Sequence, residues 1–179
     1  MSYTFSRRAF LKYSAATAVA VAGASLLGGC EYQDPKNPVC KTLPGAVKSD
    51  LNVIAGLKSM KIEKGTCTLE VDIESARANP IRLVTDCFSI AVKDSEGKSR
   101  YFSMNNGGVQ ILDAENSQIE KNSPITLHLK AVNFPELKDD DTVLFQYIPI
   151  RENSEYSMNW EITKKVYDEF IANQSTSKN

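Results

Sequence analysis

Apolar and polar side chains alternate with a period of two in several short runs of the chain. In residues 67–74, four apolar side chains alternate with one threonine and three acidic side chains. Residues 125–131 repeat this pattern, with Leu127 and Leu129 on one parity and His128 on the other. Successive side chains of a strand point to opposite faces of a sheet. The pattern therefore predicts strands with one buried face and one solvated face.

Similar runs recur along the chain at intervals of about 10 to 15 residues. We predict about seven or eight strands, at residues 57–62, 67–74, 81–92, 99–104, 109–112, 125–131, 143–150 and 156–162. Short strands separated by turn sequences are typical of an antiparallel β-sandwich. Within residues 81–92 the apolar positions change parity, which predicts a bend or a bulge.

The ends of the chain have a different composition from the middle. Residues 30–50 are rich in proline and polar residues, which predicts a tether. Residues 51–163 form the predicted sandwich domain. Residues 164–179 are expected to form a short helix, with Val166, Phe170 and Tyr167 facing inward, and a polar tail.

The first 30 residues carry a composite signal. Residues 6–12 match the twin-arginine motif S-R-R-x-F-L-K at every specified position, through Ser6, Arg7, Arg8, Phe10, Leu11 and Lys12. An uncharged stretch, residues 13–29, follows and ends directly before Cys30. A membrane span needs about 20 predominantly apolar residues, whereas this stretch has 17, many of them Ala, Gly, Ser or Thr. A processed export signal is the better interpretation.

Residues 1–30 resemble the signal of bacterial lipoproteins exported by the twin-arginine (Tat) route. The resemblance implies that the Tat translocase carries the folded chain, that residues 1–29 are removed, and that Cys30 receives a diacylglycerol. Two acyl chains give stable membrane anchoring. The expected location is the cell envelope, lipid-anchored to a membrane that faces the periplasm or the outer surface. The choice between inner and outer membrane stays open.

The order of the predicted strands resembles the telokin-like, immunoglobulin-like domains of bacterial lipoproteins of unknown function. The resemblance covers about residues 51–163 and includes a D-x-x-G turn at residues 94–97. It implies an all-β, immunoglobulin-like antiparallel sandwich with a short C-terminal helix. The Cys…Trp…Cys spacing of true immunoglobulin domains is absent, because Trp160 follows both Cys67 and Cys87.

The charge of the expected mature chain disfavours nucleic acid as a partner. The signal holds three basic residues and no acidic ones, so 18 of the 21 basic residues remain beside all 22 acidic ones, a net charge of −4. Affinity for nucleic acid depends mainly on lysine and arginine contacts to phosphates. We therefore expect no nucleic-acid binding.

Three cysteines remain once Cys30 is acylated, and their spacing fits no Cys-x-x-Cys motif. A chain reversal at residues 76–80 would return Cys67 and Cys87 to the same depth, so we predict a disulfide between them. Cys40 is an alternative partner for either one. A protein that folds in the reducing cytoplasm must be stable without such a bond.

The residue types needed for chemistry do not occur in a catalytic pattern. His128 is the only histidine, and no Gly-x-Ser-x-Gly or P-loop motif is present. The acidic run 139–141 lacks the glycine and the alternation of a calcium loop. The carboxylates at positions 70, 72 and 74 could bind a cation or a basic partner, or could form the solvated face of a sheet. We expect no enzyme activity, no metal and no cofactor.

Aromatic residues gather late in the chain. Phe145 and Tyr147 share one face of a predicted strand, and Tyr156 and Trp160 share one face of the next. They predict either a cluster in the core or a recognition platform.

The functional hypothesis is a non-enzymatic, membrane-tethered lipoprotein that binds or assembles with an envelope protein. Two alternatives stay open. One is an accessory subunit of an exported redox complex, because many Tat clients hold or accompany a redox cofactor. The other is a lipoprotein that binds a small ligand or a metal.

Overall fold

The computed structural model describes residues 34–102, 109–113, 117–151, 153 and 155–176. The expected signal, residues 1–29, and Cys30 lie outside this part of the chain.

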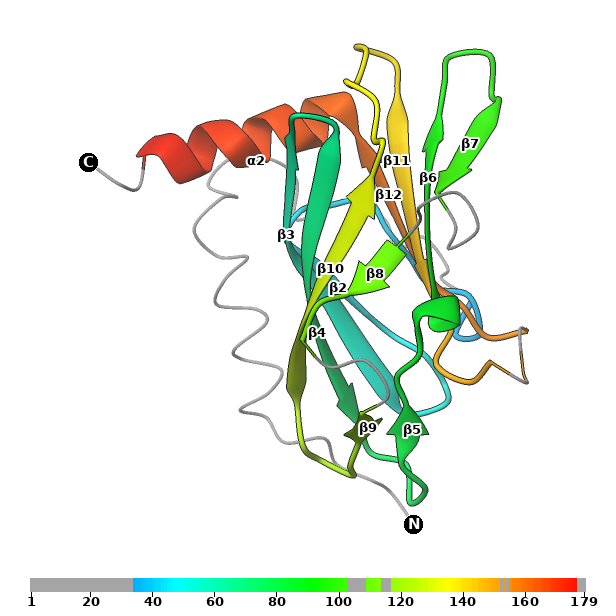
Figure 1. The fold of residues 1–179 in the computed structure, drawn as a ribbon. Coiled ribbons are helices and arrows are strands. Elements are labelled where there is room, and N and C mark those ends of the chain that lie inside the picture. The colour runs from blue at the N-terminus through cyan, green and yellow to red at the C-terminus, as the bar shows by residue number, and fades with distance from the viewer. Residues whose placement is uncertain (1–33, 103–108, 114–116, 152, 154, 177–179) are drawn as a thin grey trace, which may run out of the picture.

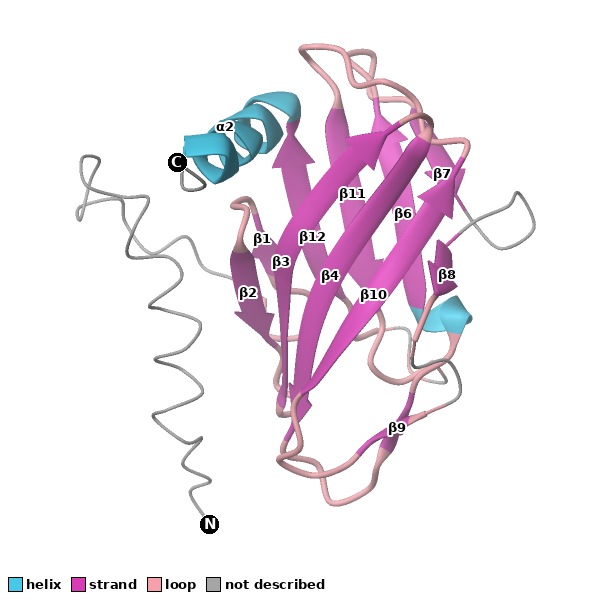
Figure 2. Cartoon of the chain, turned by 60° about the vertical axis from the view of Figure 1, so that its left-hand side comes forward, coloured by secondary structure: helices cyan, strands magenta, loops and turns pink. Residues whose placement is uncertain are grey.

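Two five-stranded sheets face each other (Figures 1 and 2). Sheet 1 contains, in spatial order, β1 (Val39–Cys40), β12 (Met158–Thr163), β11 (Thr142–Tyr147), β6 (Phe88–Lys93) and β7 (Ser99–Phe102). Sheet 2 contains β2 (Gly45–Lys48), β3 (Val53–Glu63), β4 (Thr66–Ser75), β10 (Ile125–Val132) and β8 (Val109–Ile111). All neighbours in the two sheets pair antiparallel except β1 and β12, which pair parallel.

The connectivity is that of an immunoglobulin-like sandwich. In that fold, strands A, B, E and D form one sheet, and C, F and G form the other. Strands β3, β4, β10 and β8 take the first set of places, and β6, β11 and β12 take the second. The prediction of an all-β, immunoglobulin-like sandwich is confirmed.

The strands follow the predicted runs with a few additions. Each of the eight predicted runs contains a strand, and residues 81–92 contain two. Here β5 (Ile81–Arg82) pairs with β9 (Gln118–Ile119) in a small separate sheet. A turn of 3-10 helix, η1 (Thr85–Cys87), then leads into β6. The change of parity thus marks a crossing between sheets rather than a bulge. Strands β1, β2 and β9 were not predicted.

Residues 34–50, the described part of the expected tether, belong to the sandwich instead. They contribute β1 to sheet 1 and β2 to sheet 2. Four of their side chains are buried, Pro38, Leu43, Val47 and Ser49. The prolines shape the turns around two short strands, and the few apolar residues between them are enough to attach the segment to the core.

The C-terminal helix α2 (Lys164–Thr176) follows β12 directly and is confirmed. The predicted inward residues Val166, Tyr167 and Phe170 are partly buried against the core. The Tyr167 hydroxyl oxygen also accepts a hydrogen bond from the backbone N–H of Ile62, at 3.0 Å. This contact fixes the helix to the end of β3.

Candidate functional site

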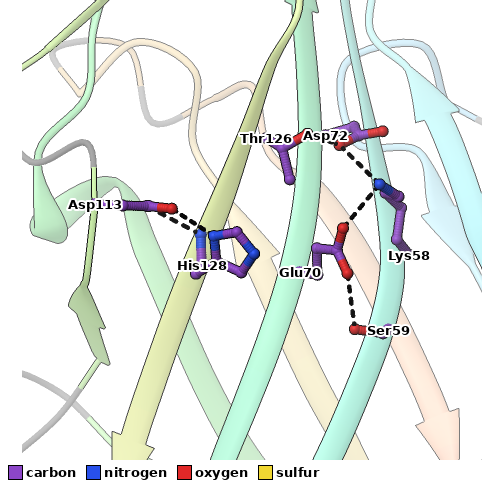
Figure 3. A network of polar contacts seen from close by, with 7 residues as sticks. All are labelled: Lys58, Ser59, Glu70, Asp72, Asp113, Thr126 and His128. Atoms are coloured by element: carbon purple, nitrogen blue, oxygen red, sulfur yellow. Dashed lines mark hydrogen bonds and ion pairs between the residues drawn. The ribbon is translucent and has the colours of Figure 1, made fainter.

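A network of polar side chains covers the outer face of sheet 2 (Figure 3). The alternation of β4 and β10 places it there, since Glu70 is opposite His128 and Asp72 is opposite Thr126 in the strand register. The inner face of the same strands holds the aliphatic core.

An irregularity in β3 brings a basic residue to this network. The register with β4 shifts between Leu57 and Ser59, so Lys58 is the extra residue of a bulge. Both Lys58 and Ser59 reach Glu70: Lys58 Nζ lies 2.8 Å from Glu70 Oε1, and Ser59 Oγ donates to Glu70 Oε2 at 3.5 Å. Without the extra residue, the regular alternation of the strand would place these two neighbours on opposite faces.

The carboxylates of Glu70 and Asp72 therefore share one ammonium group, that of Lys58. Lys58 Nζ also lies 3.6 Å from Asp72 Oδ1, which accepts a hydrogen bond from Thr126 Oγ1 at 2.6 Å. The hydrogen bond from Lys58 lowers the pKa of Glu70, and the same bond raises the pKa of Lys58. The lowered pKa keeps the Glu70 carboxylate ionised at neutral pH, and the Lys58 ammonium contacts both carboxylates within the sheet.

His128 forms a second pair with Asp113, which follows β8 at the edge of the sheet. Leu112 N–H donates to His128 O at 2.9 Å, and His128 N–H donates to Asp113 Oδ1 at 3.2 Å. The ring Nδ1 of His128 contacts Asp113 Oδ2. Partial burial acts to raise the pKa of Asp113, but the hydrogen bonds from His128 outweigh it and lower the pKa below its ordinary value.

A groove of about 360 Å³ lies between the two pairs. Its lining residues are Ser59, Thr68, Leu69, Glu70, Leu112, Asp113, His128 and Leu129. Leu112 is 56% exposed, one of two large apolar side chains that are strongly exposed in the described part of the chain. The groove offers an apolar wall beside a carboxylate and an imidazole. This combination suits a ligand that has both an apolar and a polar part.

The three carboxylates expected to form a ladder are separated by their surroundings. Glu70 and Asp72 contact Lys58, whereas Glu74 is buried, with 7% of its surface exposed. In the acidic run 139–141, Asp141 is buried and accepts the backbone N–H of Lys138 at 2.9 Å, which closes the turn before β11. Among the described residues, no group of three or more His, Cys, Asp or Glu side chains is arranged to hold a metal ion.

The predicted Cys67–Cys87 disulfide is not formed. None of the three described cysteines takes part in a disulfide. Cys67 lies near the start of β4 in sheet 2, and Cys87 ends η1 just before β6 in sheet 1. The chain does not return along β4 after residue 75 but crosses through β5 to the other sheet, so the two cysteines do not reach the same depth. Burial raises the pKa of the Cys67 thiol to about 12.

Three of the four late aromatic residues are part of the core. Phe145, Tyr147 and Trp160 are at most 1% exposed. Tyr156 is separate from them, at the start of the segment that leads into β12, where the Lys36 ammonium lies 5.5 Å from its ring. The interpretation as a core cluster holds for three of the four residues.

The charged residues Lys58 and Asp113 of the network were not singled out from the sequence. Lys58 could have been suspected only from a break in the alternation of β3, because a regular strand places residues 58 and 59 on opposite faces. Asp113 carries no sequence signal, since its contact with His128 depends on the pairing of β8 with β10.

The residues of the export and lipidation signal lie outside the described residues. Within the described residues, none of the helices has the length and the apolar character needed to cross a bilayer.

Comparison with known proteins adds little to these contacts. No protein-family model and no curated protein matches the chain. Among solved structures, the yjhA protein from Bacillus subtilis aligns with 69% of this chain and 99% of its own, at 15% identity and a TM-score of 0.47. The fold and the candidate site therefore rest on the residues and contacts of this chain.

Proposed function

We propose that the protein is a lipid-anchored module of the bacterial cell envelope that acts by binding a partner protein. The anchor rests on the twin-arginine motif at residues 6–12 and on Cys30. The binding role rests on one observation, the groove on the outer face of sheet 2, with exposed Leu112 beside the His128–Asp113 pair.

The chemistry of the groove favours binding of a segment of protein over binding of a free cation. The carboxylates of Glu70 and Asp72 already contact Lys58, and Asp113 contacts His128. A cation would have to displace a basic side chain from each of these carboxylates. An apolar side chain could instead pack on Leu112, while a neighbouring polar group bonds to His128 or Thr68.

Two matched substitutions test the groove. Leu112→Glu places a charge against the apolar wall and should lower the recovery of a crosslinked envelope partner by about tenfold, which corresponds to about 1.4 kcal/mol of binding energy. Tyr101→Glu is the control, because Tyr101 is 60% exposed but lies on β7 of the other sheet. Equal losses for the two variants, or no loss for Leu112→Glu, would contradict a role of the groove.

The anchor is tested separately by the intact mass of the protein from the membrane fraction. A chain that begins at Cys30 and carries a diacylglycerol is the expected result. Cys30→Ser should leave uncleaved precursor in the membrane. A soluble, cleaved Cys30→Ser protein that begins near residue 30 would show that acylation is not the reason for processing.

A further inference from the structure

We infer that one end of the sandwich, here called the near rim, lies against the lipid headgroups of the bilayer that holds the anchor. The near rim consists of residues 34–38, 49–52 and 155–157. This inference rests on the proposed acylation of Cys30, and it adds to it which surface of the domain the membrane contacts.

The described part of the chain enters the domain through a hydrogen-bonded turn. Asp34 and Asn37 form a turn: Asn37 N–H donates to Asp34 O at 3.0 Å, and Lys36 N–H donates to Asp34 Oδ1 at 2.9 Å. The hydrogen bonds from Lys36 and Asn37 lower the pKa of the Asp34 carboxyl, so the turn keeps its ionised acceptor at neutral pH.

This turn is joined to two other segments of the near rim. Pro35 O accepts the backbone N–H of Asp50, and Lys36 O accepts the backbone N–H of Ser157, both at 3.0 Å. Asn37 Oδ1 accepts the hydroxyl of Ser157 at 2.9 Å. The domain therefore holds the chain from residue 34 onward, before β1 begins.

Only a short length of chain connects this turn to Cys30. Four peptide units separate Cys30 from Asp34, and consecutive Cα atoms are about 3.8 Å apart, so these two Cα atoms are at most about 15 Å apart. The ten residues of β4 span about 30 Å from the far end of the sandwich to the near rim. The connection is thus shorter than the domain, and the near rim cannot move far from the bilayer.

Two side chains of the near rim, those of Lys36 and Tyr156, are of kinds that contact lipid headgroups. The Lys36 ammonium lies 5.5 Å from the centre of the Tyr156 ring and 4.0 Å from Glu155. Tyrosine has an apolar body and a polar tip, and it is enriched at membrane interfaces. The lysine offers a donor to lipid phosphates. The opposite end, here called the far tip, consists of the turns at residues 64–65 and 94–97 and the start of α2 (Figure 1).

Energy transfer to a headgroup dye tests the inference. Asp50→Cys on the near rim and Ser95→Cys on the far tip are each labelled with a donor dye, in a Cys40→Ser background. Both sites are exposed, and the other two described cysteines are buried. The acylated proteins are placed in vesicles of phosphatidylethanolamine and phosphatidylglycerol that contain the acceptor. Transfer from position 50 should exceed transfer from position 95 by at least about twofold, because about 30 Å of strand separates the two ends.

A variant with a longer linker tests whether the short connection to Cys30 holds the near rim at the bilayer. Twenty glycine and serine residues inserted between residues 33 and 34 add a coil of about 25 Å, and transfer from position 50 should fall toward that from position 95. Equal transfer from the two positions in protein that floats with the vesicles would overturn the inference and leave the anchor in place. Unchanged transfer with the spacer would also overturn it. A protein that does not float with the vesicles would overturn both the inference and the proposed anchor.

Discussion

The two sheets contribute different chemistry to one core. Sheet 1 supplies rings: Phe88 stacks on Tyr147 with centroids 4.9 Å apart, and Phe145 packs on Trp160 at 5.2 Å. Sheet 2 supplies aliphatic side chains that are at most 2% exposed, namely Leu69, Val71 and Ile73 of β4 and Leu127, Leu129 and Ala131 of β10. Large aromatic side chains contribute more buried area per residue, but Tyr and Trp also bring polar atoms that need partners. The two halves should therefore respond differently to substitution.

The polar atoms of the rings show the contrast within sheet 1 itself. Trp160 Nε1 donates to Gly45 O at 3.1 Å, so the indole of β12 is bonded to β2 of the opposite sheet. The Tyr147 hydroxyl is buried and has no hydrogen-bond partner within the described residues. The Trp160 ring thus links the two sheets through its N–H group. The unpaired hydroxyl of the Tyr147 ring instead lowers the stability of the fold.

The largest expected effect is that of Trp160→Ala. It removes the biggest buried side chain, its contact with Phe145 and the donor to Gly45 O, and it should lower the free energy of unfolding by about 4 to 5 kcal/mol. Leu129→Ala in sheet 2 is the matched substitution and should cost about 3 kcal/mol. Urea unfolding followed by circular dichroism measures both. If Leu129→Ala cost as much as Trp160→Ala, the proposed difference between the two halves would be wrong.

Regular alternation was the part of the fold that could be predicted from the sequence. Residues 67–74 and 125–131 alternate strictly, and both form strands with the expected buried face. Helix α2 was also predicted, because its apolar residues recur at helical spacing. Strands β1 and β2 were missed because only a few apolar residues, set between prolines, attach them to the core, which local pattern does not reveal.

The candidate site was less predictable because it depends on pairing between distant segments. His128 was noticed as a solvated residue, but its partner Asp113 lies across an edge that only the β8–β10 register defines. Glu70 and Asp72 were seen as a ladder of carboxylates, whereas a bulge in β3 adds Lys58 between them. The predicted cysteine bridge failed for a related reason: it assumed a simple reversal where the chain crosses to the other sheet.

Tyr147→Phe should stabilise the protein, by less than Trp160→Ala destabilises it. Removing an unpaired buried hydroxyl should raise the free energy of unfolding by about 1 kcal/mol at neutral pH. Burial raises the pKa of Tyr147 above its ordinary value of 10.0. The unfolded chain therefore ionises first, and the wild type loses stability as the pH rises above about 10.

Unfolding at alkaline pH separates the effect of removing the unpaired hydroxyl from the effect of removing an ionisable phenol. Tyr147→Phe should lose less stability than the wild type between about pH 9 and 11, because it has no phenol to ionise in the unfolded state. Urea unfolding at pH 7, 9, 10 and 11 measures the difference. A loss of stability at pH 7 would mean that the hydroxyl has a partner in the folded protein.

The smallest expected effect is on the outer face of sheet 2. Glu70 has a lowered pKa in the folded protein because Lys58 hydrogen-bonds to it. Its contribution to stability is present above its ordinary pKa of 4.5 and is lost as the pH falls through the lower folded value. Glu70→Gln should therefore lower the free energy of unfolding by at most about 1 kcal/mol at pH 7, because the Lys58–Glu70 pair is partly exposed. It should have no effect once the pH is below both pKa values.

Glu161→Gln, at an exposed position on β12 of sheet 1, is the control. Thermal unfolding from pH 7 to 3 should show the two variants converging in acid, and a Glu70→Gln deficit that persists there would mean that the side chain acts through packing rather than through its charge.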